Sequence, residues 1–572
     1  MDTASIIASI AKAQNILKLL TCLQLTAYLW PPEAIVQDGA YADYLIIGGG
    51  TAGSLIASYL VKQKNISVIV IEAGGMGEFE TTQPGLFPLL KNSKSDWNFT
   101  TVSHGPFQQG KVLGGSSQVD YMIYGIGNPE DYNRWAAITN DSSWTLKNLC
   151  PLIKRTEKVT DPRILDSPDV FFHGTEGKMR IKKYHKSLND GFFEAYREMG
   201  QKVVNDINGK NPLGYTDTYF TIGQGTRQST AYSFLSPERD NPNLKVLYNS
   251  LATKIIFDDN KRAVAVRVLT KDKKYITINA RREIIVAAGA IKSPQLLMLS
   301  GIGPRQHLES KKIKVISNLP VGQNFQDNPT NVMVYEMGAA DTVSPHNPHE
   351  FPVAVMEGRV AIKACQKRAD YQILSGLIVD PSFFLQVCSS VFSFKNSICD
   401  NLHKSLSGRQ VHFVTHHLLY SESRGEILLN STDPEDYPII DPKYYSNPRD
   451  IERHAEYLEH YNRIVDTKYY KSLNAEFVDP QLENCKGLKP GTQSYWKCYV
   501  LGMATTLHNY VGTCAMGSVV DSKLRVLGVK NLRVADASVM PEIVGATVKG
   551  TVIVIAQKLV DILIEDYRFS SY

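Results

Sequence analysis

The sequence predicts an α/β fold organised around a parallel sheet, and three stretches of the chain support this prediction. Residues 42–50 read "ADYLIIGGG", an apolar run that ends in glycines, as in a strand buried on both faces of a parallel sheet. A segment with apolar residues at helical spacing follows, and then a second apolar run, "ISVIVIEAGG", at 66–75. Residues 282–290, "REIIVAAGA", read as another buried strand that ends in small residues.

The turn Gly48-Gly49-Gly50-Thr51-Ala52-Gly53 lies between the first strand and the helix and fits the pattern G-x-G-x-x-G. The first glycine permits the tight turn, the second lets a pyrophosphate approach the backbone, and the third lets helix and strand pack closely. Glu72 ends the next strand, where a carboxylate can accept hydrogen bonds from an adenosine ribose. We therefore expect dinucleotide binding, rather than a glycine-rich turn of an unrelated α/β fold. This motif alone does not separate FAD from NAD.

The later part of the chain mixes strands and helices and contains no internal repeat. Residues 244–288 are predicted to be rich in β-strands, because apolar runs of strand length alternate there with turns. Three helices are predicted, within residues 293–304, 451–473 and 551–567. The first should be stopped by Gly301, and the second should be one amphipathic helix.

Composition and charge exclude several classes of function. The 572 residues are 43% hydrophobic and 21% charged, which is an ordinary globular composition for two large domains or one elaborate domain. The net charge is +5, and the densest basic stretch, "KDKKY" at 271–275, reads as a solvated hairpin turn. We therefore expect no nucleic-acid binding. No spacing of cysteine and histidine suggests a metal site.

The chain has eight cysteines and no C-x-x-C motif, and most of them are expected to be buried thiols. Cys485 and Cys498 are the exception, because they flank a stretch rich in glycine and proline. A local disulfide between them is expected if the protein folds in an oxidising compartment.

Residues 1–36 are interpreted as a secretory signal peptide or as a leader that packs on the body or stays loose. The segment is mostly apolar from 16 to 30, but polar residues such as Gln24 make it a poor spanning helix. No other run is long and apolar enough to predict a stable membrane span. Secretion and glycosylation are therefore expected, with weak support from four Asn-x-Ser/Thr sequons, at Asn65, Asn98, Asn140 and Asn430.

Two further stretches carry a resemblance to a known family. Residues 110–135, "GKVLGGSSQVDYMIYGIGNPEDYNRW", contain a Gly-Gly-Ser-Ser turn whose backbone amides are bare. Residues 289–303, "GAIKSPQLLMLSGIG", match the second signature of the glucose–methanol–choline (GMC) oxidoreductases at every constrained position. Shorter matches such as "VGTCAMG" at 511–517 extend the resemblance over roughly residues 40–565. The chain is most similar to the insect branch of that family.

The resemblance implies an FAD-dependent enzyme that oxidises CH–OH groups of alcohols, with a discontinuous Rossmann-like FAD-binding domain and an α+β substrate-binding domain. The FAD-binding domain would comprise residues 37–185, 225–325 and 505–572. The substrate-binding domain would comprise residues 186–224 and 326–504.

The resemblance also implies which positions would contact FAD. The ADP half would lie on the glycine turn and Glu72, the flavin near the Gly-Gly-Ser-Ser turn, and Ala252 at a backbone position beside adenine. The implied cofactor-binding residues are Gly48, Gly50, Thr51, Ala52, Gly53, Glu72, Val112, Gly114, Gly115, Ser116, Asp120, Ala252, Asp536 and Ala537.

The largest departure from the family lies at its catalytic histidine, which takes the hydroxyl proton while hydride passes to flavin N5. Asn509 stands at this position and Tyr510 replaces the proline that follows it. An amide cannot act as a base near neutral pH. The partner position, usually asparagine or histidine, aligns with Thr547, with a one-residue ambiguity toward Ala546.

His508 is a candidate substitute for the missing base. Neighbouring side chains point to opposite faces of a strand and lie about 100° apart on a helix, so His508 would need a local shift of the chain to reach the site. The alternative is a structural role for His508. Lys549 and Tyr510 are further candidate bases without positive support.

The flavin-side loop also departs from the family. Gln109 replaces an arginine, Asn328 replaces a histidine, and Asp120 replaces an asparagine that contacts the flavin. A carboxylate at position 120 would disfavour flavin reduction unless it is neutral or turned away.

Three functional interpretations follow. The chain is an FAD-dependent alcohol oxidoreductase whose acid–base groups are impaired or relocated, a catalytically inactive flavin-binding paralogue with a binding role, or a flavoenzyme with another reaction, such as a lyase. The expected small-molecule partner is an alcohol. The sequence does not identify the alcohol or say whether oxygen or another acceptor reoxidises the flavin.

Overall fold

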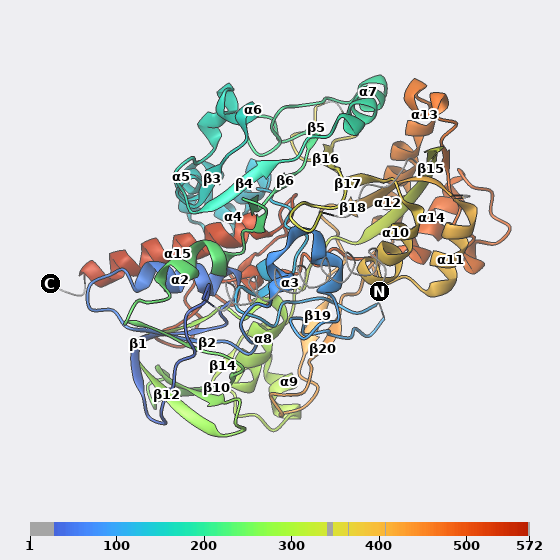
Figure 1. Cartoon of the computed structure of the whole chain (residues 1–572). Helices are drawn as coiled ribbons and strands as arrows, with labels where there is room; N and C mark the ends of the chain where they lie inside the picture. Colours follow the sequence, from blue (N-terminus) through green and yellow to red (C-terminus); the bar gives the residue numbers. More distant parts are fainter. Residues whose placement is uncertain (1–27, 104, 340–346, 364, 407, 570–572) are drawn as a thin grey trace, which may run out of the picture.

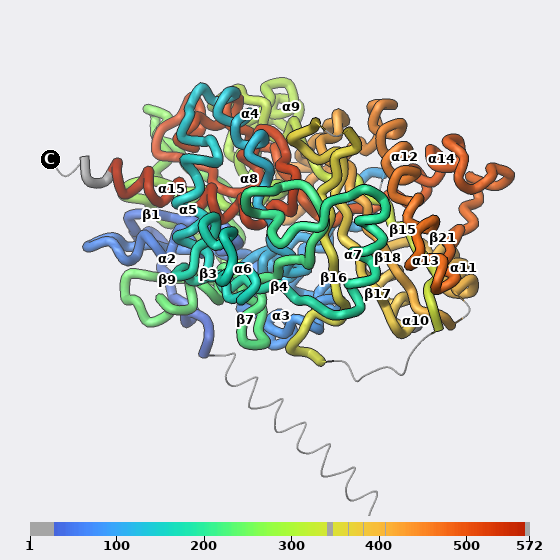
Figure 2. Tube along the Cα trace, turned by 90° about the horizontal axis from the view of Figure 1, so that it is seen from above, coloured from blue at the N-terminus to red at the C-terminus, as the bar shows by residue number. Residues whose placement is uncertain are grey.

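A computed structural model describes residues 28–569, except 104, 340–346, 364 and 407. Most of the leader segment therefore lies outside the described residues. The chain is built around two sheets, each with its own apolar core. Figure 1 shows the two sheets and the helices around them, and Figure 2 shows that the second sheet and its helices lie at the end of the molecule away from the C-terminus.

The first sheet contains the predicted parallel strands. Its order is β10-β11-β12-β1-β2-β9, and β23 pairs with β12. Strands β12, β1, β2 and β9 are parallel, whereas β10, β11 and β12 are joined as an antiparallel meander. The bounds are β1 (Tyr41–Ile47), β2 (Val68–Ile71), β9 (Leu244–Leu247), β10 (Leu251–Phe257), β11 (Ala263–Leu269), β12 (Tyr275–Val286) and β23 (Leu532–Val534).

Three helices connect this sheet to the site. Helix α2 (Thr51–Leu60) follows β1, and α8 (Gly289–Leu299) follows β12. Helix α15 (Lys549–Phe569), from the end of the chain, packs along α2 (Figure 1). The apolar residues of β1 and α2 are almost all buried, as the sequence predicted for a strand covered on both faces.

The second sheet is antiparallel, in the order β21-β15-β18-β17-β16-β5, with β22 paired to β15. Its bounds are β5 (Gly214–Asp217), β15 (Thr330–Ala339), β16 (Val355–Val360), β17 (Tyr371–Ile378), β18 (Arg409–Leu418), β21 (Glu476–Phe477) and β22 (Ala504–Thr505). The helices beside it are α10 (Pro381–Gln386), α11 (Asn396–Ser405), α12 (Pro448–Asn462) and α14 (Gln493–Gly502).

A third group of elements lies between residues 129 and 227, with its first helices near α15 and its last helix beside β5 (Figure 1). Its helices are α4 (Pro129–Thr139), α5 (Leu146–Thr156), α6 (Pro162–Leu165) and α7 (Asp190–Glu198), and its strands are β3 (Glu157–Val159), β4 (Met179–Lys183), β6 (Tyr219–Phe220), β7 (Ile222–Gly223) and β8 (Thr226–Arg227).

The predicted strands between 244 and 288 and the helix within 293–304 are confirmed by β9 to β12 and α8. The prediction of one amphipathic helix over 451–473 is wrong. Helix α12 ends at Asn462, a 3₁₀ turn covers Arg463–Asp466, and α13 spans Lys468–Ser472. Thr467 has extended backbone angles and its hydroxyl donates to the carbonyl of Ile464, so the side chain ends one helical segment and the backbone starts the next.

The predicted disulfide Cys485–Cys498 is confirmed. A second disulfide, Cys388–Cys399, joins the turn after α10 to α11. The expectation that most cysteines are buried thiols is therefore wrong, because only Cys150, Cys365 and Cys514 are free in the described part of the chain. Within the same described residues, no helix is long and apolar enough to cross a membrane.

Candidate active site

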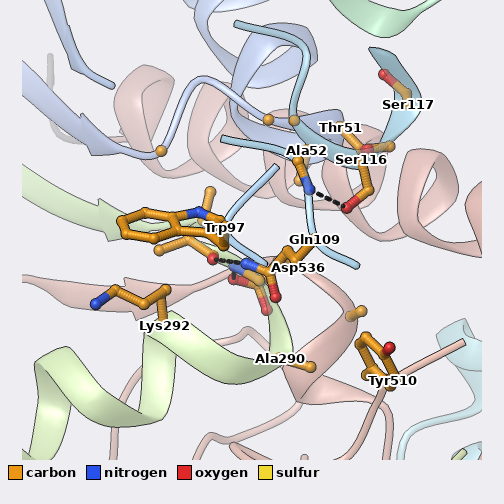
Figure 3. Close-up of a pocket in the computed structure, with 18 of the residues that line it drawn as sticks. Thr51, Ala52, Trp97, Gln109, Ser116, Ser117, Ala290, Lys292, Tyr510 and Asp536 are labelled. Carbon is orange, nitrogen blue, oxygen red and sulfur yellow. Dashed lines mark hydrogen bonds between the residues drawn. The ribbon is translucent and has the colours of Figure 1, made fainter. Parts of the chain in front are cut away.

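A cavity runs from the carboxyl ends of the parallel strands to the second sheet. Ile47 and Ile71 line it from the first core, whereas Ile123 and Leu374 line it from the second. Figure 3 shows part of this cavity, with Trp97 and Lys292 on one side and Tyr510 on the other. The sequence-predicted residues that line it are Gly48, Gly50, Thr51, Ala52, Glu72, Gly115, Ser116, Asp120, Ala252, His508, Asn509, Asp536, Ala537 and Thr547.

The glycine turn after β1 forms one end of the cavity. Gly48 has a φ of +96°, and an added Cβ would lie 2.5 Å from the carbonyl oxygen of Ala287, so only glycine fits there. Gly53 does not line the cavity, and an added Cβ there would lie 1.9 Å from the carbonyl oxygen of Gly48, so glycine is needed for this close packing of α2. Gly50 is the N-cap of α2 and provides no side-chain cap. The first N–H groups of α2 therefore remain available for a phosphate.

Glu72 lies directly after β2, next to this turn. Its Oε2 accepts a hydrogen bond from the Gly49 amide at 2.8 Å, and its Oε1 accepts one from the Gly74 amide at 2.7 Å. Burial raises the pKa of Glu72 to about 7. Each carboxylate oxygen keeps a lone pair for a ribose hydroxyl. Ala252, on β10, lines the cavity with Glu72.

The second glycine turn lies against the first. An added Cβ on Gly115 would come within 2.7 Å of the Gly50 Cα, so the two turns approach each other closely. The Ser116 hydroxyl accepts a hydrogen bond from the Gly110 amide at 3.2 Å (Figure 3). Val112 and Gly114 support this turn but do not line the cavity.

Asp536 connects the C-terminal segment to α8. Its carboxylate accepts hydrogen bonds from the Gly289 amide at 2.8 Å, the Ser293 hydroxyl at 2.6 Å and the Ser538 amide at 2.8 Å. Gln109 donates to the carbonyl of Ala288 at 3.1 Å beside it (Figure 3). The uncapped start of α2, the two glycine turns and the buried carboxylates fit a dinucleotide with its pyrophosphate on the turn.

The segment that carries His508 and Asn509 is fixed by Asp327. This buried carboxylate accepts a hydrogen bond from the backbone amide of Asn509 at 3.0 Å. It also accepts hydrogen bonds from the hydroxyls of Tyr444 and Thr506. His508 has a φ of +65°, in the left-handed region that few non-glycine residues adopt. The segment is therefore neither strand nor helix, and His508 and Asn509 both line the cavity. The two side chains are therefore not held on opposite faces, as they would be in a regular strand.

The His508 ring has one partnered and one unpartnered nitrogen. Nδ1 forms a hydrogen bond with the Tyr510 hydroxyl, whereas Nε2 is buried and has no partner among the residues that the structure describes. The Tyr510 ring stacks on Phe107 with ring centres 4.5 Å apart, which fixes its hydroxyl. Burial, assisted by the charge of Lys91, lowers the pKa of His508 well below its usual value, so the ring is neutral at neutral pH.

Asn509 and Thr547 differ from His508 in their contacts. The side-chain amide of Asn509 donates a hydrogen bond to Oδ1 of Asn328 at 3.4 Å. The Thr547 hydroxyl is buried and has no partner in the described part of the chain, and an added Cβ on Gly125 would meet it at 3.1 Å. Thr547 thus lines the cavity while its hydroxyl lies beside the Gly125 backbone.

Asp120 is paired with two cations. Its Oδ1 lies 2.9 Å from Nη1 of Arg227, and its Oδ2 lies 2.9 Å from Nζ of Lys549. Nζ of Lys549 also donates to the Thr221 hydroxyl at 2.8 Å. The carboxylate that the sequence places near the flavin is therefore compensated. Sequence reasoning missed Arg227 and Asp327, because both are far in the sequence from Asp120 and Asn509, the residues that they contact.

The comparison with known families agrees with this geometry. Two GMC oxidoreductase family models match the chain, one at residues 42–330 and one at residues 421–556. The chain is a GMC oxidoreductase. The first match contains both glycine turns, and the second contains His508, Asn509 and Lys549. This GMC oxidoreductase binds FAD and belongs to a family that acts on alcohol-type substrates.

Individual relatives are similar over nearly the whole chain. The GMC oxidoreductase is 33% identical to the ecdysone oxidase of Bombyx mori, over 95% of this chain and 84% of the relative. It is 32% identical to the ecdysone oxidase of Spodoptera littoralis, over 98% and 97%. A solved structure of Aspergillus oryzae formate oxidase superposes with a TM-score of 0.81 at 25% identity and covers 93% of this chain and all of that one.

Proposed function

We propose that this GMC oxidoreductase oxidises a CH–OH group of an alcohol and that His508 takes the place of the family's catalytic histidine. The observation that carries the proposal is a histidine that lines the cavity, His508, whose Nε2 has no hydrogen-bond partner among the described residues. Bound FAD supplies the hydride acceptor, flavin N5. The remaining task is removal of the hydroxyl proton, and an imidazole near neutral pH suits it.

Tyr510 selects the ring form that this task requires. If Nδ1 of His508 carries the proton and donates it to the Tyr510 oxygen, Nε2 keeps a lone pair that can accept a proton. The lowered pKa keeps this lone pair free at neutral pH. It also makes the imidazole a weaker acceptor, so we expect slower chemistry than with an unperturbed histidine. Asn509 would then hold the substrate oxygen by a hydrogen bond rather than take its proton.

The cavity wall favours an alcohol with a large apolar skeleton. Ile123, Leu374 and Leu507 line it from the second core, and the ring of Tyr121 lies with them. Two relatives that are similar over nearly the whole chain are named ecdysone oxidases, so a steroid alcohol is the first substrate class to test. The acceptor that reoxidises the flavin is oxygen or another compound, and the geometry favours neither.

Anaerobic stopped-flow spectroscopy tests the proposal. The FAD-loaded protein is mixed with ecdysone, aliphatic, aromatic and sugar alcohols, and bleaching of the flavin absorbance is followed. We expect bleaching with at least one bulky alcohol, and a lower rate constant in His508→Ala. The second candidate, an inactive flavin-binding paralogue, is favoured by the amide of Asn509 at the family's base position. It is the correct description if the flavin stays oxidised with every alcohol.

We also propose that the protein is secreted and glycosylated. Two disulfides and four exposed sequon asparagines support this, at Asn65, Asn98, Asn140 and Asn430. Expression in insect cells, with glycosidase digestion of the medium and the lysate, tests it. A protein found only in the lysate, without a mobility shift, would contradict it. The domain boundaries given above also stand as proposals, which limited proteolysis can test.

A further inference from the structure

Lys549, Asp120 and Arg227 form a charged cluster in which two cations share one carboxylate. Arg227 has no solvent-exposed side-chain surface, and Lys549 is 7% exposed. Nε and Nη2 of Arg227 have no hydrogen-bond partner among the described residues. A single carboxylate balances only one of the two charges. The cluster therefore carries a net positive charge that the described protein groups around it do not neutralise.

The position of the cluster shows which end of a dinucleotide it meets. Asp120 and Lys549 line the cavity, whereas Arg227 stands behind them. With the pyrophosphate at the start of α2 and the ribose at Glu72, the adenosine would occupy that end. The flavin would then extend the other way, toward the residues shared with the second sheet. Asp120 begins the run that ends at Ile123, in the second core, and this places Lys549 at the flavin end.

The charge of that end matters because of how flavin is reduced. A hydride brings two electrons and one proton to the oxidised ring, so the ring gains a negative charge unless a second proton enters. A fixed cation in a cavity that excludes water stabilises such a charge more than the same cation would in water.

We propose that Lys549 presents the net positive charge of this cluster to the cavity and stabilises the negative charge that the bound flavin gains on reduction. Asp120 positions the ammonium group and weakens its field, and Arg227 compensates Asp120 from behind. The inference rests on the FAD site of the proposed function, but it does not depend on alcohol turnover. The aspartate at position 120 still opposes reduction by itself, as expected from the sequence, but the two cations outweigh it because the cluster as a whole is positive.

The test is the midpoint potential of the FAD-loaded protein, measured by equilibration with reference dyes during reduction by dithionite. Lys549→Met removes the charge and keeps most of the side-chain volume. We expect the substitution to weaken the binding of reduced flavin, relative to oxidised flavin, by at least about tenfold. For a two-electron couple this makes the midpoint potential about 30 mV more negative. Lys549→Arg keeps the charge and should retain the original potential.

Asp120→Asn provides an independent arm with the opposite sign, because it removes the negative charge and should make the potential more positive. Lys558→Met is the matched control. Lys558 lies further along α15 and contacts the Trp144 ring and the Ser143 carbonyl outside the cavity. The midpoint potential of Lys558→Met should therefore equal that of the parent protein.

A Lys549→Met protein that keeps its flavin and shows the original potential overturns the proposal. If Lys549→Met loses FAD, the potential of Asp120→Asn tests the proposal instead. An unchanged or more negative midpoint potential of Asp120→Asn overturns the proposal. Dithionite reduces the flavin without any alcohol. A failure of alcohol oxidation therefore cannot be mistaken for a failure of this inference.

Discussion

The ring of His508 and the hydroxyl of Tyr510 are joined by a hydrogen bond that spans Asn509, the residue at the family's catalytic position. Asn509 and Tyr510 both depart from the family pattern, and the contact between His508 and Tyr510 depends on the second of these departures. The left-handed backbone of His508 makes this contact compatible with a ring in the cavity wall. We therefore interpret Asn509 and Tyr510 as one coupled rearrangement of the site rather than as two independent losses.

Tyr510→Phe tests the coupling. It removes the hydrogen bond and keeps the stacking on Phe107, so the ring of His508 loses its orientation without loss of packing. We expect the rate constant for flavin reduction by an alcohol to fall about tenfold, as for a lost hydrogen bond of about 1.4 kcal/mol. Tyr457→Phe, which removes a hydroxyl bonded to Asp370 outside the cavity, is the control. Equal rates in Tyr510→Phe and the parent would leave Tyr510 with a packing role only.

Removal of the imidazole and its return at the neighbouring position form a second test. His508→Ala should lower the rate constant of flavin reduction by about 10²–10⁴-fold, the usual contribution of a general base. Adding Asn509→His and Tyr510→Pro restores the family's arrangement and should recover part of the loss. Anaerobic stopped-flow spectroscopy measures all three proteins. If His508→Ala reduces its flavin as fast as the parent, another group accepts the proton.

Gly50→Leu should separate folding from cofactor binding. An added Cβ on Gly50 meets nothing closer than the Gly115 Cα at 3.6 Å, so the chain can fold, but the leucine would fill the space of the pyrophosphate. We expect a protein that folds and carries no flavin absorbance. Gly338→Ala, whose Cβ would meet only Leu473 at 3.5 Å, should keep its flavin. Stoichiometric FAD in folded Gly50→Leu would exclude the turn as the phosphate site.

Stability should depend on pH through buried histidines of opposite sign. Burial lowers the pKa of His412, His417 and His454 to about 3, so the unfolded chain binds more protons below about pH 6.5. Their contribution is complete above that pH and is lost as the pH falls. Glu157 and Asp206 raise the pKa of His173 to about 10, so its contribution is complete below about pH 6.5 and is lost as the pH rises toward 10.

The melting temperature should therefore be highest near about pH 6.5 and fall on both sides. His412→Gln should flatten the acid side and His173→Gln the alkaline side, whereas Gln at the exposed His349 should change neither. Scanning calorimetry between pH 4 and 10 measures the three curves. A melting temperature that does not change between pH 7 and 4.5 would contradict the assignment of neutral buried histidines.

The disulfide Cys485–Cys498 closes a short loop before and along α14. Cys485→Ala with Cys498→Ala should lower the free energy of unfolding by roughly 2–4 kcal/mol, because the open loop gives the unfolded chain more conformations. Chemical denaturation measures the change. Peptide mapping without reduction of protein from a secreting cell should find the two cysteines linked. Two freely alkylated thiols would show that the bond does not form there.

The features that the sequence predicted well are local. The glycine turn, Glu72 and the run from β12 to α8 are specified by adjacent residues, and their geometry follows from chain connectivity and burial. The backbone around His508 is held by Asp327, a residue nearly two hundred positions away, so neighbouring residues alone could not predict its conformation. The charges around Asp120 come from Arg227 and Lys549, in distant segments. No spacing rule connects such groups until the fold brings them together.

The cavity is completed by the last strand and helix of the chain, since Asp536 follows β23 and Lys549 begins α15. During synthesis, the glycine turn near the start leaves the ribosome long before these residues exist. A nascent chain would thus expose the glycine turn before the residues on the other side of the cavity, Asp536 and Lys549, have been synthesised. We therefore expect FAD to be loaded after release of the finished polypeptide. Variants truncated before α15 should emerge without flavin and be removed by cellular quality control.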